Sequence, residues 1–264
     1  MNDKNQGQDN KRVIWVTGGK GGVGKSTFSR GLLDVLLDAG VNVAAFDGDP
    51  SNAQLFRYYQ GVGDGVQCVD LDKQGEADVL LNQMEESKAD IFLVDVAAGG
   101  SQTLLDLEGD IGLISEAMDM GYRFTVVSVM SRIKDSVNLL KASLEMTDDF
   151  DVQHVAVKNL YFGACVGVAS LGNRFRLFDG SKTKVRLLER GGVVMEMPDL
   201  FDDTYELLDQ KNLPFRAMLA DKAFPRAQRS RINKWLKDFE GAIAKAAKET
   251  DGKTAEEIAE VLGL

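Results

Sequence analysis

Residues 19–27 read Gly-Lys-Gly-Gly-Val-Gly-Lys-Ser-Thr and lie between two segments with different hydrophobic patterns. The preceding residues 12–17 (RVIWVT) form an apolar run of strand length, and residues 26–39 repeat apolar side chains at helical spacing. A glycine-rich segment between a strand and a helix is typical of a phosphate-binding loop with the pattern G-x-x-x-x-G-K-[ST]. The residues that satisfy this pattern are Gly19, Gly24, Lys25 and Ser26.

The residue types in this loop suit the binding of a nucleoside triphosphate together with Mg²⁺. Glycines let backbone N–H groups approach an anion without a Cβ in the way, and a helix beginning at Ser26 directs its unpaired amides toward the phosphates. We expect Lys25 to bridge the β- and γ-phosphate oxygens and the Ser26 hydroxyl to ligate the metal. The predicted loop contacts to the nucleotide are Gly19, Gly21, Gly22, Val23, Gly24, Lys25, Ser26 and Thr27.

A second lysine, Lys20, lies inside the loop, where the general phosphate-loop pattern does not require one. Residues 20–26 match the signature K-G-G-x-G-K-[ST], and through them the chain resembles the ParA/MinD family of deviant Walker A ATPases. In that family the signature lysine reaches across a dimer interface to the nucleotide held by the other subunit. The resemblance therefore implies a homodimer that sandwiches ATP, with Lys20 acting in trans; the alternative is a solvated loop charge.

The composition is that of a soluble globular chain, with 264 residues, 44% hydrophobic and 27% charged. We expect a polar tail at 1–11, one ATPase domain at 12–248, and an acidic tail or short helix at 249–264. No window reaches the ~18 apolar residues that a membrane span needs, and the first residues lack the apolar core of a secretory signal. Cys68 and Cys165 lack C-x-x-C spacing, so we expect both to be reduced core thiols in a cytoplasmic protein.

Apolar runs bounded by Gly, Asp or Pro predict strands at 12–17, 41–46, 66–71, 91–96, 123–129, 153–157 and 193–197. Helical periodicity predicts helices at 26–39, 75–87, 103–118, 132–147, 181–190, 200–210 and 224–247. Most of the strand segments are continuously apolar, as in parallel strands covered on both faces. The predicted fold is α/β: a doubly wound, mostly parallel sheet of about seven strands flanked by helices, as in P-loop NTPases. Residues 163–183 are expected to form a loop carrying a short helix, and His154, which opens a strand, to have no catalytic role.

Acidic residues end two of the predicted strands. Residues 91–94 are apolar and run into Asp95, as in a Walker B element, so we expect Asp95 to hold Mg²⁺ through a water. Asp47 and Asp49 follow the second predicted strand, where two carboxylates at this spacing either face the phosphates or cap the turn before Pro50. By resemblance, Asp49 would orient the attacking water and Asp47 would support the metal or the surroundings of the loop lysine.

Base recognition is expected at later strand ends. Asn159 ends a strand where family members place an amide that reads adenine, and Pro198 resembles the segment whose backbone borders that base. Asn52 is either a switch residue or a turn amide.

One departure from the family lies at 96–100 (VAAGG), where relatives commonly carry proline after the Walker B acid. We expect this segment to be more flexible and to become ordered when nucleotide or a partner binds.

The net charge of −10 is unevenly distributed. Residues 222–248 contain eight basic and two acidic residues. In the helix expected at 224–247, an apolar stripe predicts a core face made of Ile232, Trp235, Leu236, Phe239 and Ile243. The candidate DNA-contacting residues on the remaining surface are Arg226, Arg229, Arg231, Lys234 and Lys237. ParA relatives bind DNA through basic residues in this region; the alternative is a solvated basic helix.

Three functions remain open. The first is a ParA-like ATPase with slow basal turnover that positions or segregates DNA or another cargo, in plasmid or chromosome partition or conjugative transfer. It would bind DNA nonspecifically, and an unidentified stimulating or cargo protein would trigger hydrolysis. The second is a metabolic or protein-cargo ATPase that does not bind DNA. The third, a MinD-like membrane cycle, is disfavoured because residues 254–264 carry three glutamates and no basic group. With the first expected strand beginning at residue 12, the chain resembles the short ParA type.

Overall fold

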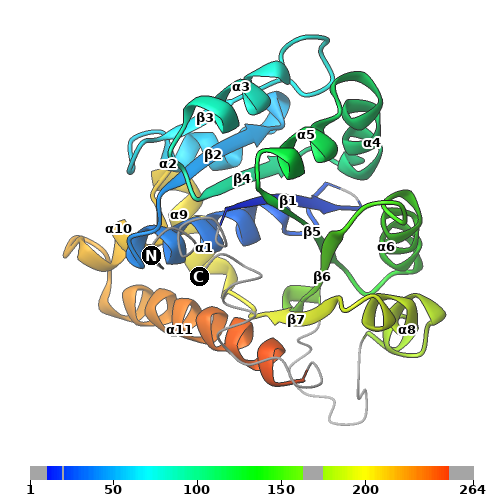
Figure 1. Cartoon of the computed structure of the whole chain (residues 1–264). Helices are drawn as coiled ribbons and strands as arrows, with labels where there is room; N and C mark the ends of the chain where they lie inside the picture. Colours follow the sequence, from blue (N-terminus) through cyan, green and yellow to red (C-terminus); the bar gives the residue numbers. More distant parts are fainter. Residues whose placement is uncertain (1–10, 20, 163–174, 250–264) are drawn as a thin grey trace, which may run out of the picture.

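The computed structural model describes residues 11–19, 21–162 and 175–249, with side chains in the last helix described as far as residue 243. Lys20, Cys165 and residues 250–264 lie outside this part. The described chain forms a seven-stranded sheet in the order β3-β2-β4-β1-β5-β6-β7, and all of its strand pairs are parallel. The predicted α/β fold is therefore confirmed (Figure 1).

Strand β1 lies at the centre of the sheet, with β4 on one side and β5 on the other. The strands are β1 (Arg12–Gly18), β2 (Val43–Gly48), β3 (Val66–Cys68), β4 (Ile91–Val96), β5 (Arg123–Met130), β6 (Val152–Asn159) and β7 (Val193–Met197). The chain leaves β1 for β2 and β3 on one side, returns to β4 between β2 and β1, and then builds β5, β6 and β7 on the other side, so the direction of winding reverses at β1. In such sheets ligands bind in the crevice at the carboxyl ends of the strands, at the point of reversal. The glycine-rich loop leaves β1 at that point.

Helices cover both faces of the sheet. They are α1 (Lys25–Asp38), α2 (Gln54–Tyr59), α3 (Asp78–Glu86), α4 (Gly100–Ile111), α5 (Leu113–Asp119), α6 (Lys134–Met146), α7 (Arg176–Asp179), α8 (Lys182–Glu189), α9 (Asp202–Lys211), α10 (Phe215–Ala220) and α11 (Arg226–Glu249). Alternate residues of β1 serve opposite faces, as strand geometry requires. Ile14 and Val16 pack with α1 and α11, whereas Val13 and Trp15 pack with α4 and α5. In Figure 1, α1 and α11 lie on one side of the sheet, and α4, α6 and α8 lie on the other.

The helix expected at 103–118 is two helices in the structure. Gly112 adopts a left-handed conformation with φ of 65°, which ends α4 and begins α5. Two helices of six residues each, α2 and α10, were not predicted, because such short segments hold too little periodic pattern to detect.

Cys68 is exposed, which corrects the expectation that it is a core thiol. The reason is the length of its strand: β3 has only three residues and forms one edge of the sheet, and only Val66 in it is buried. The strand predicted at 66–71 is therefore too long. Val69 and Leu71 are buried, but they lie after the end of β3.

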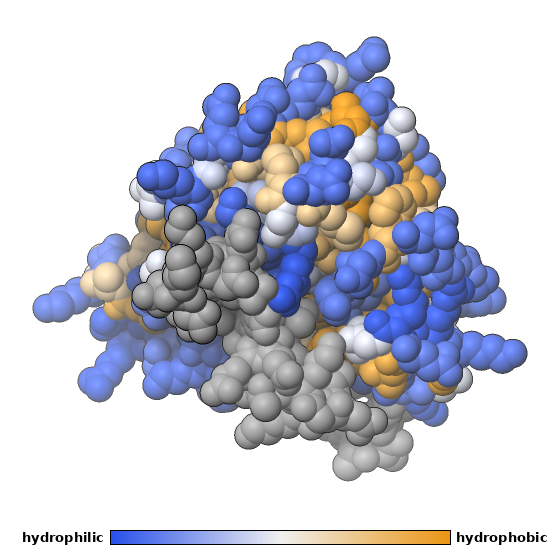
Figure 2. Space-filling model, viewed as in Figure 1, coloured by the Kyte–Doolittle hydropathy of each residue, from blue (hydrophilic) through white to orange (hydrophobic). Residues whose placement is uncertain are grey.

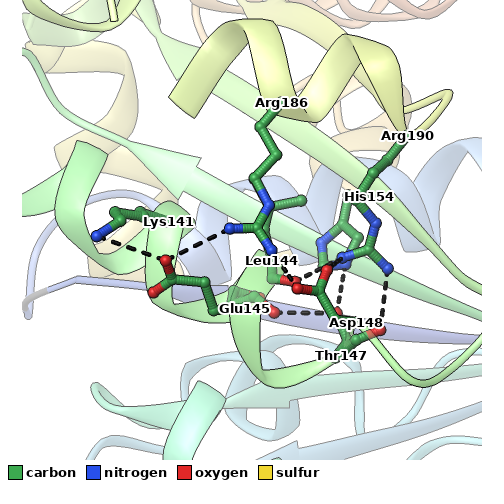
Figure 3. Close-up of polar contacts among 9 residues, drawn as sticks. Lys141, Leu144, Glu145, Thr147, Asp148, His154, Arg186 and Arg190 are labelled. Carbon is green, nitrogen blue, oxygen red and sulfur yellow. Dashed lines mark hydrogen bonds and ion pairs between the residues drawn. The ribbon is translucent and has the colours of Figure 1, made fainter. Parts of the chain in front are cut away.

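His154 is buried in β6 and makes a hydrogen bond inside the fold. Its Nε2 lies 2.8 Å from Thr147 Oγ1, whose hydroxyl proton is donated to the Ser143 carbonyl at 3.0 Å. The imidazole therefore donates from Nε2 and is neutral. Burial, with a smaller contribution from the Arg190 guanidinium, lowers the pKa of His154 to about 3. Arg190 is itself held by Asp148 at 2.8 Å and by the Thr147 carbonyl at 2.9 Å (Figure 3).

We expect His154 to make the fold sensitive to acid. The unfolded imidazole binds a proton near pH 6.5, whereas the folded one resists protonation until about pH 3. This contribution to stability is therefore present above pH 6.5 and is lost as the pH falls below it. At pH 5 the loss is about 2 kcal/mol. His154→Gln keeps a donor for Thr147 without titrating, so its unfolding free energy in urea should fall about 2 kcal/mol less than the wild type's between pH 7.5 and 5. Equal losses in the two proteins would contradict this.

Candidate functional site

The glycine-rich loop connects the carboxyl end of β1 to the N-terminus of α1. Gly24, at the N-cap of α1, has φ of 100°, and a Cβ there would lie 2.3 Å from Asn159 Nδ2. Only glycine fits this backbone at this distance. In the described part of the chain, α1 has neither a side-chain cap nor an acidic residue in its first turn. Its first amides and the positive end of its dipole are therefore available to an anion.

A cavity of about 490 Å³ opens in front of this helix end. The candidate residues that line it are Gly21, Gly22, Gly24, Lys25, Ser26, Thr27, Asp49, Asn159 and Pro198. These residues come from the ends of β1, β2, β6 and β7, so parallel topology brings together side chains far apart in sequence. The Lys25 side chain is buried at its edge. Lys20, the signature lysine, lies outside the described residues.

Asp95 is buried near Ser26 of the loop and is not among the residues that line the cavity. It is the fifth residue of β4, and interaction with the Ser26 hydroxyl lowers its pKa against the larger effect of burial. Burial raises the pKa of Asp95 to about 7, and the charge of Asp47, opposite it on β2, raises it further. Within the described chain, Asp95 Oδ1 has no hydrogen-bond partner.

These features fit a magnesium ion. A buried carboxylate oxygen without a donor, next to a serine hydroxyl, offers the oxygen atoms that Mg²⁺ takes as ligands or as acceptors for its waters. The described residues contain no cluster of three or more His, Cys, Asp or Glu side chains able to hold a metal ion. A cation here would therefore draw its remaining ligands from phosphate and water, as Mg²⁺ does when it binds with a substrate.

Asp47 and Asp49 both accept backbone hydrogen bonds. Asp47 is buried and its carboxylate accepts from the amides of Phe56 at 3.0 Å and Asp49 at 3.1 Å. Asp49 accepts from the Ser51 hydroxyl at 2.6 Å and from the Asn52 amide at 3.2 Å. These contacts are the ones expected if the two carboxylates cap the turn before Pro50. Asp49 nevertheless also lines the cavity. Metal support by Asp47 and water orientation by Asp49 stay predictions.

Asn159 links the loop to the end of β6. Its Nδ2 donates to the Val23 carbonyl at 2.9 Å, and its Oδ1 accepts from the Tyr161 amide at 3.0 Å. An amide side chain has two N–H groups and two acceptor lone pairs. One N–H group and one lone pair of Asn159 therefore remain for a base. The observed role of Asn159 is to hold the loop, and its recognition of adenine stays a prediction.

Two aromatic residues that line the cavity were not predicted as site residues from the sequence. They are Tyr205 of α9 and Trp235 of α11. The Trp235 indole donates to the Pro198 carbonyl at 2.8 Å, and one turn earlier the Arg231 guanidinium lies 4.3 Å from the centroid of the Phe201 ring. Helix α11 therefore holds the loop after β7 that borders the cavity. No motif marks these residues, and their helical spacing indicated only a core face.

The expected core stripe of α11 is confirmed, since all five of its residues are buried. Outside the stripe, Arg226, Arg231, Lys234 and Lys237 are exposed and Arg229 is half-buried. Lys234 pairs with Asp238 at 2.5 Å. Arg226 and Arg229 also border a surface hollow together with Ser230 and Asn233. In Figure 2, hydrophilic residues cover the lower left of the molecule, where α11 lies in Figure 1.

Comparisons with known proteins agree with this geometry. Residues 14–245 match the model of the CobQ/CobB/MinD/ParA nucleotide-binding domain. Protein MobD of Acidithiobacillus ferrooxidans is 29% identical over 239 residues, which cover 88% of this chain and 98% of that protein.

Two solved structures are similar in fold. One is the septum site-determining protein MinD of Pyrococcus horikoshii with Mg-ADP, at a TM-score of 0.50 and 18% identity, covering 90% of this chain and 99% of that chain. The other is a nucleotide-binding protein of Archaeoglobus fulgidus with ADP, also at 0.50 and 18%, covering 77% and 87%. In the described part of the chain, no helix is long and apolar enough to cross a bilayer.

The loop geometry predicts that Gly24 and Gly21 differ in their tolerance of a methyl group. Gly24→Ala should lower the free energy of unfolding by about 1–3 kcal/mol, because it combines a left-handed φ with the contact to Asn159. Gly21→Ala is the matched control, since a Cβ there meets nothing within 4 Å. It should change stability by less than about 0.5 kcal/mol. Urea unfolding of both variants measures this; equal effects would show that the Gly24 backbone is not constrained as described.

Proposed function

Because the chain belongs to the CobQ/CobB/MinD/ParA nucleotide-binding domain family, we propose that it is a Mg²⁺-dependent ATP hydrolase that dimerises on ATP. We propose further that it acts in the cytoplasm to position or segregate DNA or another cargo. The observation that carries the proposal is the uncapped N-terminus of α1, which lies with Lys25 and Ser26 at the cavity, with the buried carboxyl group of Asp95 near Ser26.

Each described residue of the site has a part in binding a triphosphate. The first amides of α1 and the Lys25 ammonium bind phosphate oxygens, and Ser26 and Asp95 hold the metal side. Bound Mg²⁺ would supply charge neutralisation at the bridging and terminal phosphate oxygens. Tyr205, Met197 and Pro198 line the same cavity and offer an apolar and aromatic surface for a base.

Hydrolysis requires a positioned water and stabilisation of the developing charge. Asp49 borders the cavity and is held by Ser51 and Asn52, so its carboxylate is fixed in place to accept a hydrogen bond from a water. Lys20 would supply a positive charge to the nucleotide of the second subunit, as the family resemblance implies. If the Lys20 charge reaches the nucleotide only in the dimer, the monomer hydrolyses ATP slowly.

The cargo is proposed from α11. Its exposed cations suit the phosphate backbone of DNA, whose binding by long basic side chains is independent of sequence. The basic face is local, since the chain as a whole carries −10. The second candidate, a metabolic or protein-cargo ATPase without DNA binding, is favoured by the pairing of Lys234 with Asp238, which removes one cation from that face.

The two lysines of the loop should have separable effects. Lys25→Ala should weaken ATP binding at least 100-fold, because it removes charge-assisted hydrogen bonds to phosphate, each of which contributes about 1.5–3 kcal/mol. Lys20→Ala should retain binding and lose ATP-driven dimerisation. Titration with a fluorescent ATP analogue and analytical ultracentrifugation with ATP and Mg²⁺ measure the two effects. Normal affinity in Lys25→Ala would refute the loop assignment, and normal dimerisation of Lys20→Ala would refute the trans role.

Nonspecific DNA binding is tested with a random-sequence duplex across a salt series, in ATP and in ADP. We expect ATP-dependent affinity that falls steeply with salt. Arg226→Glu with Arg229→Glu should abolish it at physiological salt while ATP hydrolysis persists; Arg231 is left intact because it contacts Phe201. The matched control is Arg176→Glu with Lys182→Glu, which makes the same charge change on exposed residues of α7 and α8. If the wild type does not bind DNA, or if the two double variants lose DNA affinity equally, the second candidate function would be favoured.

A further inference from the structure

The segment that follows the acid of β4 borders the nucleotide cavity. Residues 97–100 read Ala-Ala-Gly-Gly, Ala98 lines the cavity, and helix α4 begins at Gly100. The segment lies directly beyond Asp95 and Val96. The backbone conformation of this segment therefore shapes the cavity near Asp95. None of its own side chains is larger than a methyl group.

Backbone contacts hold this segment in place. Gly99 has φ of 95°, and a Cβ at Gly100 would lie 2.0 Å from Val96 Cγ2 and 3.2 Å from Thr17 Oγ1. Gly100 is thus packed directly on β4 and β1. In the described part of the chain, the N-terminus of α4 has no side-chain cap. Two glycines in succession are costly to order, so a specific contact is needed to fix the turn.

Trp15 supplies that contact. Its indole Nε1 donates to the Gly100 carbonyl at 2.9 Å across 85 residues of sequence. The ring is fully buried, and Trp15 pairs in register with Val94 of β4 and Val126 of β5. A donor on the central strand of the sheet cannot move independently of the sheet. The bond therefore fixes the glycine-containing turn at 97–100 to the central strand of the sheet.

We propose that Trp15 is a positioning residue for nucleotide hydrolysis, which acts through the Gly100 carbonyl by fixing the turn at 97–100 beside the cavity. This inference rests on the proposed ATPase function. Trp15 does not line the cavity, so we expect it to have no part in binding. Its loss should therefore act on turnover and spare affinity. A purely structural indole would affect stability alone.

The experiment compares three forms of the full-length chain with the wild type. Trp15→Phe removes the indole N–H and some volume. Incorporation of 3-benzothienylalanine at position 15 removes only the N–H, because sulfur replaces nitrogen in a ring of the same shape. Tyr122→Phe is the matched control: the Tyr122 hydroxyl lies 3.3 Å from two backbone carbonyls in the same core cluster as Trp15, away from the cavity.

We expect kcat for ATP to fall about tenfold in both Trp15 forms, with KM changed less than twofold. A tenfold fall in kcat corresponds to about 1.4 kcal/mol, which is the size expected when one hydrogen bond that holds the reacting arrangement is lost. Amide hydrogen exchange at residues 99–103 should rise in both forms and stay constant in Tyr122→Phe, whose kcat should equal that of the wild type. Exchange is measured without nucleotide, so it reports on the turn independently of turnover.

Three results would overturn the inference. Unchanged kcat in the benzothienyl form would show that the N–H is not needed, even if Trp15→Phe is slow through lost packing. An equal fall of kcat in Tyr122→Phe would assign the effect to general destabilisation. Unchanged exchange at 99–103 would show that the bond does not hold the turn. Absence of hydrolysis in the wild type would instead defeat the proposed function, and the positioning role with it.

Discussion

The structure depends on delivering the amide end of α1 to the point where the sheet reverses its winding. The chain has only residues 19–24 in which to leave the central strand and begin the helix, so the turn is tight. Gly24 meets this constraint with a left-handed backbone packed against Asn159, and Phe28 and Leu32 fix the helix axis by packing under α11. With the helix so placed, its first amides face the cavity and are available to an anion. The chemistry of the site follows from that one placement.

The buried carboxyl group of Asp95 destabilises the fold in a way that a bound cation would offset. Asp95 is buried beside Asp47, and burial raises the pKa of Asp95 from 3.8 to about 7. For an acid with a raised pKa, the free energy of unfolding decreases as the pH rises from about 4 to 7, because the unfolded carboxyl group ionises while the folded one still holds its proton. Near neutral pH the carboxyl group is therefore close to half ionised. A positive ion bound there would favour the charged form, which is how an active site can be less stable when empty than when loaded.

Much of the fold could be predicted because it is local. The seven strands and the first helix follow from continuous apolar runs and from one glycine-rich motif. What escaped prediction depends on contacts distant in sequence. The helices α2 and α10 are too short for periodicity, Gly112 splits one expected helix, and the edge position of β3 exposes Cys68. In the candidate site, the strand-end residues were predictable from topology. Tyr205 and Trp235 were not, because only the packing of α9 and α11 against β7 brings them to the cavity.

The chain contains two tryptophans, and each donates its indole N–H to a backbone carbonyl beside the cavity. One bond reaches the turn after β4 and the other reaches the loop after β7, and both segments contribute residues to the cavity lining. Indole emission depends on hydrogen bonding and on the polarity around the ring. The molecule thus carries an intrinsic optical reporter at each of these two segments, and its ultraviolet fluorescence would register a shift of either one without any added label.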